Sequence, residues 1–558
     1  MGVLGGIDPS FIDKEVSPRQ DFYRYAVGSW IDANPIDAHP EHSRWGAFEE
    51  LIERNHELLR ELLEAEAAAH PDSLLGRFYS SGMNTVAADA AGYTPLSDLF
   101  DTIDAVASVE DVVAAAAALR AVGVGALWRV DVETDSQNSE MAVLHLSQSG
   151  LGLPDRDFYV LDDKASLREQ YVAVVARLLT LWGMDAEAAA TAAANVMTLE
   201  TLMARASLTR VERRDPVATY NRHDSVSDLT ALTEGVVDWS AYLSALPGLT
   251  DGLSGPYILD HPPFFTAVAR LLKEMPLGVW RAYLRWQVLA KFSPFAHTEA
   301  VDAHFAFFGT ALNGQKELKP LYKRVGMKTG AMVEAPLAEL YIAKTFSPQA
   351  KEAVLSMVDR IMKLLVERVK ALDWMGEETK EAALAKLAAM RVKVGYPDSY
   401  EPLELELAAG APYVANVRAG EAAKLSAEMK RNNLPVDKVR WEMPVRWWGG
   451  VKVGGGVTGG VGWGRGASPV ARDLRRWTLT RSLGGVLWSF SLFGCLVVLR
   501  AGLRRPAVHG KCVLPSIERG DCLPGCHPAA PVLCRPHRRA ALWGSCCELW
   551  GHWCGYCS

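Results

Sequence analysis

A histidine followed by a glutamate, at His56 and Glu57, is one place where the residue types in this sequence could do metal chemistry. Two histidines four residues apart on a helix reach one zinc ion, and a glutamate beside the first activates a zinc-bound water, as in the pattern His-Glu-x-x-His. Here the fifth position is Arg60, a cation where a second ligand is required. We therefore predict no metal role for His56 and expect a solvated histidine on a helix surface.

The C-terminal region holds the other candidate ligands. All nine cysteines lie between residues 495 and 557, and residues 546–557 combine four of them with His552. A zinc knuckle or a Cys-x-x-Cys redox pair needs a fold that orients the thiolates, and no second Cys-x-x-Cys follows at finger spacing. The glycines at residues 462–466 lack the Gly-Lys-Ser/Thr of a phosphate loop. We predict neither a metal centre nor a nucleotide site here.

The charge balance changes near residue 442. The chain has 59 Lys+Arg and 66 Asp+Glu, of which 15 and 5 lie from Glu442 onward, leaving 44 and 61 before it, or about +10 against −17. An acidic body without cysteines argues against a disulfide-built secreted scaffold, and we expect no nucleic-acid partner. The first residues lack a basic, apolar signal sequence, so the expected location is cytoplasmic.

Hydrophobic periodicity predicts a mainly α-helical body. Residues 43–60 place Phe48, Leu51 and Ile52 on one face of a helix. Residues 347–372 give the clearest helical signal, because Ser347 can cap the helix and Pro348 suits its first position. A second helix is expected over residues 377–390, antiparallel to the first. Strand content is expected to be small, with one strand entering a tight loop at residues 144–154.

Eight stretches, in this order along the chain, resemble the neprilysin-like zinc metallopeptidases of peptidase family M13, whose bacterial members include oligopeptidase O. They are Asp21 to Tyr25 with Gly28 and Trp30, Ser43 to Gly46, Gly150 to Tyr159, Arg214-Asp215 with Tyr220-Asn221, Glu339 to Tyr341 with Phe346, Asp373 to Lys380, Gly395 to Asp398, and Pro435 to Asp437 with Trp441 and Met443.

The resemblance implies a large helical domain that faces a smaller thermolysin-like zinc domain across a chamber open to peptides. By this resemblance, residues 1–40 are a segment expected to pack on the zinc domain and residues 41–443 are the helical domain. Residues 444–558 are then an irregular or disordered Gly/Trp/Cys/Arg-rich tail in place of the catalytic domain. The family's arginine that binds the substrate's terminal carboxylate corresponds to Arg44. A guanidinium suits that role because it can bind a carboxylate bidentately.

One departure from the family decides the functional expectation. The family holds zinc through His-Glu-x-x-His and a downstream glutamate, and that zinc activates water against the peptide carbonyl. No His-Glu-x-x-His occurs in the 558 residues. By resemblance the chain is a zinc-dependent metalloendopeptidase that cleaves short peptides, but without the zinc motif we expect it to bind no zinc and to be catalytically inactive. The alternatives are a peptide-binding pseudo-enzyme and a non-functional truncated product.

The tail itself suggests a frame change in the DNA. Out-of-phase reading of a G/C-rich gene enriches Gly, Arg, Pro, Cys and Trp, as in residues 444–558. The family's Ala-Ile-Leu-Gln-Pro-Pro, read out of phase, gives approximately the His-Pro-Ala-Ala of residues 527–530. Residues 483–499 form an uncharged run at the short end of a membrane span, which glycines and serines weaken. We therefore expect no membrane insertion.

Overall fold

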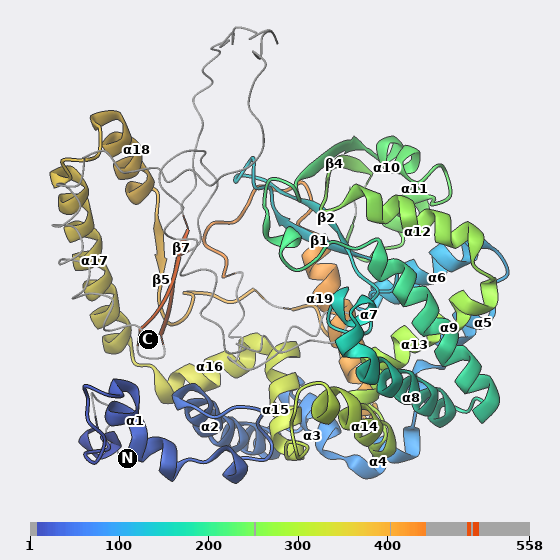
Figure 1. Ribbon diagram of the computed structural model, residues 1–558, viewed down its shortest axis with the longest axis horizontal. Coiled ribbons are helices and arrows are strands. Elements are labelled where there is room, and N and C mark those ends of the chain that lie inside the picture. Colours follow the sequence, from blue (N-terminus) through green and yellow to red (C-terminus); the bar gives the residue numbers. More distant parts are fainter. Residues whose placement is uncertain (1–7, 250–252, 402, 442–487, 493–494, 501–558) are drawn as a thin grey trace, which may run out of the picture. The chain divides into compact units, whose positions relative to one another are not determined.

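The computed structural model describes residues 8–249, 253–401, 403–441, 488–492 and 495–500, and all of them belong to one unit spanning residues 1–503. The described chain is mainly α-helical, as predicted (Figure 1). The helices are α1 Phe22–Ala33, α2 Ala47–Ala69, α3 Leu74–Met83, α4 Thr85–Ala91, α5 Ser97–Asp104, α6 Val109–Ala121, α7 Asp157–Val160, α8 Ala165–Trp182, α9 Ala186–Arg205, α10 Val226–Leu232, α11 Trp239–Ser244, α12 Pro262–Glu274, α13 Leu277–Phe292, α14 Thr298–Phe305, α15 Leu321–Met332, α16 Glu334–Thr345, α17 Pro348–Ala371, α18 Glu377–Ala388 and α19 Tyr413–Met429.

A four-stranded sheet accompanies the helices, in the order β1-β2-β4-β3. Its strands are β1 Trp128–Thr134, β2 Ala142–Gln148, β3 Asn221–Ser225 and β4 Ser254–Leu259. The sequence indicated only β2. The pair β2–β4 is parallel and the other two pairs are antiparallel. Strand β3 escaped prediction because it is a polar edge strand, Asn-Arg-His-Asp-Ser, with no apolar alternation.

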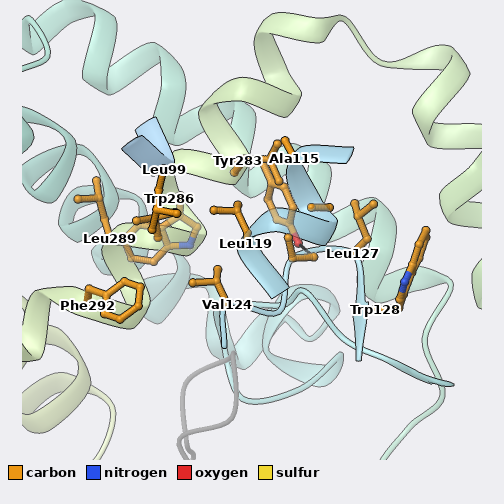
Figure 2. Close-up of a cluster of buried hydrophobic side chains, with 14 of the residues drawn as sticks. Leu99, Ala115, Leu119, Val124, Leu127, Trp128, Tyr283, Trp286, Leu289 and Phe292 are labelled. Atoms are coloured by element: carbon orange, nitrogen blue, oxygen red, sulfur yellow. Dashed lines mark hydrogen bonds between the residues drawn. The ribbon is translucent and has the colours of Figure 1, made fainter. Parts of the chain in front are cut away.

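Large aromatic side chains fill the main core. Trp128 of β1 is fully buried and packs against Trp239 of α11, with ring centroids 4.6 Å apart. Figure 2 shows a neighbouring part of this core, where aliphatic side chains of α5 and α6 lie beside Tyr283, Trp286 and Phe292 of α13. Burial of these rings is the main favourable free-energy term that holds the helices together.

The stretch of residues 150–159 is anchored to the helical core by buried hydrogen bonds. Glu200 of α9 is fully buried, and it accepts hydrogen bonds from the hydroxyls of Tyr159 (2.6 Å) and Tyr171 (2.8 Å). Trp286 Nε1 donates to the Tyr171 hydroxyl at 2.7 Å. Gly150 has φ +87°, and its carbonyl accepts hydrogen bonds from α13. Residues 150–159 therefore have a structural role, because their hydrogen bonds go to buried partners.

The predicted helix pair at residues 347–390 is confirmed as α17 and α18, which contact each other. The Ser347 side chain caps α17 by accepting a hydrogen bond from the Ala350 amide at 3.2 Å. The spacing of apolar residues predicts one face made of Val354, Val358, Ile361, Leu365, Val369 and Leu372. In the structure Val369 is buried, Val354, Val358 and Leu372 are half-buried, and Ile361 and Leu365 are exposed. Five large apolar side chains of α17 are between 37% and 51% exposed, namely Leu355, Met357, Ile361, Leu364 and Leu365.

Part of the C-terminal region forms strands, where we expected irregular chain. Strands β6 Trp488–Leu492 and β7 Cys495–Arg500 pair antiparallel, and β7 pairs antiparallel with β5 Arg391–Lys393. Among the residues described here, no helix has the length and apolar character of a membrane span. The cysteine, glycine and His-Pro-Ala-Ala stretches of the tail lie outside the described residues.

Candidate functional site

Arg44 lies on the connection that leads into helix α2. Its side chain is 54% exposed, and its Nε donates a hydrogen bond to Glu49 Oε1 at 2.7 Å. Glu49 lies in the first turn of α2 and is itself buried, so it holds the guanidinium in one orientation. The terminal nitrogens of Arg44 make no hydrogen bond with any residue that the structure describes.

The backbone around Arg44 is supported by stacked rings. The Trp45 indole lies flat on the His39 ring, with centroids 3.3 Å apart and an angle of 6° between the planes. His42 meets the same indole edge-on at 5.2 Å. Gly46 then begins α2 as its N-cap, and a Cβ there would come within 3.2 Å of Glu49 Oε2. In the Ser-Arg-Trp-Gly motif, Arg44 therefore pairs with Glu49, Trp45 stacks on His39, and Gly46 is the N-cap of α2.

A buried ion network lies next to this connection. The Lys323 ammonium, on α15, donates to Glu41 Oε1 and to Glu53 Oε2. His42 Nε2 is 3.0 Å from Glu53 Oε1, and His56 Nδ1 is 3.3 Å from the same oxygen. The contact joins α2 to α15 across about 270 positions of sequence, so it holds the start of α2 against the helical body.

Burial and charge perturb the groups of this network. Burial acts to raise the pKa of Glu53, but hydrogen bonds from His42, His56 and Lys323 outweigh it and hold that pKa well below its usual range. Burial acts to lower the pKa of Lys323, and hydrogen bonds to Glu41 and Glu53 raise it above the ordinary value. Both shifts favour the charged forms, so the network is an ion pair at neutral pH.

The network does not fit a metal ion. Ligand atoms of Glu41, His42 and Glu53 lie within 4.8 Å of one another, which in the described part of the chain is the only grouping of metal-ligand type. Lys323 already bonds both carboxylates, and a metal would have to displace this 6%-exposed cation. This cluster is therefore a salt-bridge network whose cation occupies the place that a zinc ion would need.

One sequence expectation in this region is wrong. His56 is 3% exposed rather than a solvated surface residue. That expectation came from Arg60 at the fifth position of the pattern, whereas the burial of His56 depends on how helices such as α3 and α15 pack against α2, which the local sequence does not show. Sequence reasoning also missed the roles of Glu41, Glu53 and Lys323. No spacing signal could have found them, because their pairing depends on residues far apart in the chain.

The fold is that of the helical part of an M13 peptidase, and residues 18–397 match the family model described as "Peptidase family M13". The chain belongs to this family. Endothelin-converting enzyme 1 of Cavia porcellus is 26% identical over 419 residues, and this alignment covers 72% of the chain and 54% of that protein. Endothelin-converting enzyme-like 1 of Rattus norvegicus is 26% identical over 459 residues, with 78% and 58% coverage. The chain spans about half the length of these relatives.

Solved structures agree with this assignment. The zinc metalloprotease Zmp1 of Mycobacterium tuberculosis, in complex with an inhibitor, superposes with a TM-score of 0.71 at 28% identity, covering 78% of this chain and 66% of that one. PepO from Lactobacillus rhamnosis has a TM-score of 0.67 at 18% identity, covering 77% and 68% respectively, and this likeness supports the fold alone.

Proposed function

We propose that this chain is a non-catalytic peptide-binding member of the M13 zinc metallopeptidase family. The observation that carries the proposal is Arg44, whose guanidinium is exposed, oriented by Glu49 and unpaired at its terminal nitrogens. An arginine held this way can bind the terminal carboxylate of a short peptide with two parallel hydrogen bonds. The ligand class is therefore peptides with a free C-terminus.

The proposal includes the absence of catalytic activity. Zinc in this family would supply a Lewis acid and an activated water for attack on a peptide carbonyl. The 558 residues contain no His-Glu-x-x-His. Among the described residues, Lys323 already pairs with the carboxylates of the one cluster of potential metal ligands. We expect pure protein to release no product from a fluorogenic peptide after incubation with zinc. Metal-dependent turnover that a chelator abolishes would overturn this part of the proposal.

Binding tests the role of Arg44 directly. A hydrogen bond to a charged group contributes about 1.5–3 kcal/mol. Because Arg44 is half exposed, we take one such contribution for its two bonds together, so Arg44→Ala should weaken binding of a free-acid peptide by about 10- to 100-fold. The same peptide with an amidated C-terminus should bind both proteins equally. The matched control is Arg54→Ala, because Arg54 is also about half exposed and pairs with Glu50 on the same helix. Equal affinity of wild type and Arg44→Ala for the free acid would refute the assignment.

The composition of residues 444–558 supports a second proposal, that this region is read out of frame relative to the family. The test is translation of the coding DNA and its downstream sequence in all three frames. We expect one frame to encode Asn-Ala-Tyr-Tyr followed by His-Glu-x-x-His. Their absence from every frame would exclude a frame change.

A further inference from the structure

A small cavity lies within the helical body, separate from the connection that carries Arg44. It has a volume of about 80 Å³ and is bordered by α3, α4, α14, α15, α19 and the short helix Ser293–Phe295. Its walls are largely apolar, with Phe295, Val301 and Leu321 among the lining residues. Two strong hydrogen-bond donors, Tyr413 and Arg324, also line it.

The Tyr413 hydroxyl has no hydrogen-bond partner in the described structure, although the side chain is only 7% exposed. Leaving a buried polar group unpaired costs about 1–3 kcal/mol. Burial also raises the pKa of Tyr413 well above its ordinary value, so the hydroxyl keeps its proton and remains a donor. A phenylalanine would fill the same space without this cost. We therefore expect the hydroxyl to have a hydrogen-bond partner other than the described residues.

The tyrosine ring is held rigidly. Phe78 and Phe295 both meet it edge-on, with centroid distances of 5.8 and 6.0 Å. Gly82 of α3 lies against the same ring, and a Cβ at that position would come 2.8 Å from Tyr413 and 2.5 Å from Val325. Because neighbours on α3 and on the short helix Ser293–Phe295 fix the ring, the hydroxyl cannot turn away to find another partner.

Arg324 supplies a partly buried cation at the same cavity. Its Nε donates to the Lys319 carbonyl at 3.0 Å, and it has no ion-pair partner within 4 Å among the described residues. Burial lowers the pKa of Arg324, while the negative charge of Asp302, which also lines the cavity, acts in the opposite direction. A partly desolvated guanidinium gains more from an anion than an exposed one does.

We propose that this cavity binds a small carboxylate of two to four carbon atoms. The carboxylate would accept hydrogen bonds from Arg324 and the Tyr413 hydroxyl, and the short carbon chain would pack on the apolar wall. The size limit follows from the cavity volume of about 80 Å³, since a cavity that binds benzene has a volume of about 150 Å³. The exposed carboxylate of Asp302 also lines the cavity, and it would repel a simple acid but attract the ammonium group of an α-amino acid.

Calorimetric titration of the full chain with propionate and with alanine tests the proposal. We expect saturable binding of at least one of them. Tyr413→Phe should weaken that binding by about tenfold or more, because a hydrogen bond to a charged acceptor is lost. The ligand-free variant should be as stable as wild type or more stable, since an unpaired hydroxyl is removed.

Tyr400→Phe is the matched control, because it removes another buried unpaired hydroxyl that does not line this cavity, and its binding should equal that of wild type. Tighter binding of alanine than of propionate, lost in Asp302→Asn, identifies an amino acid; the reverse order identifies a simple acid. Absence of binding by both ligands, or unchanged binding in Tyr413→Phe, overturns the proposal. Arg44 does not line this cavity, so failure of this proposal is distinct from failure of the proposed function.

Discussion

Replacement of Glu200 by glutamine should change how the stability of this protein depends on pH. Glu200 is fully buried, and burial is the largest cause that raises its pKa, from 4.5 to about 7, against hydrogen bonds from Tyr159 and Tyr171 that lower it. Because the folded state holds the proton more tightly than the unfolded state, the stabilising effect is complete below pH 4.5. It is lost as the pH rises through about 7.

The size of the effect follows from the shift. Each pKa unit corresponds to 1.36 kcal/mol, so the shift of Glu200 from 4.5 to about 7 amounts to about 3 kcal/mol. The stability of wild type relative to Glu200→Gln should therefore fall by up to that amount between pH 4.5 and pH 8. Glutamine cannot ionise, and the other titrating groups cancel in the difference between the two proteins.

Urea unfolding followed by tryptophan fluorescence, at several pH values for both proteins, measures this difference. Glu169→Gln removes an exposed carboxylate on α8 and controls for the loss of a charge. A constant difference between wild type and Glu200→Gln from pH 4.5 to pH 8 would refute the reasoning. It would show that the hydrogen bonds to Glu200 fully compensate for its burial.

Two further substitutions test other features of the fold. Gly150→Ala should destabilise the protein by several kcal/mol, because φ is +87° and the new Cβ would meet a backbone carbonyl at 2.2 Å. Gly183→Ala, at φ +119° with nothing within 4 Å, should cost only the backbone strain, about 1–3 kcal/mol. Thermal melts of the two variants compare these costs, and equal melting temperatures would contradict the close approach. Glu421→Gln should cost about 3–5 kcal/mol, because it leaves the buried ammonium groups of Lys291 and Lys328 without their carboxylate. Urea unfolding measures this loss, and a change below 1 kcal/mol would mean that the lysines lose their charge or find other partners.

The sequence was most informative where structure depends on near neighbours. Helix α17 could be predicted because the Ser347 cap and the spacing of apolar residues act within a few turns. Strand β3 could not, because an edge strand with a polar sequence is defined by its partner β4 rather than by its own residues. How far the apolar face of α17 is covered could not be predicted either, because periodicity shows which residues share a face, but not what covers it.

The candidate site shows the same difference between features set by neighbouring residues and features set by distant ones. Arg44 was chosen because Ser43 to Gly46 resembles a short motif of the family, and its role stays a prediction. The network beside it could not be predicted, because Lys323 reaches Glu53 only after α15 packs on α2. Packing between helices also buries His56, which was expected at the surface.

The sequence by itself determined the family of this protein and the absence of a His-Glu-x-x-His motif, because both depend on the order of residues along the chain. Tertiary structure alone decided which charged groups are paired in the interior. It also brought Tyr413 and Arg324, 89 positions apart, to the wall of one cavity. Pairing and enclosure arise from contacts between distant segments, whose energies depend on burial, and no short stretch of sequence carries that information.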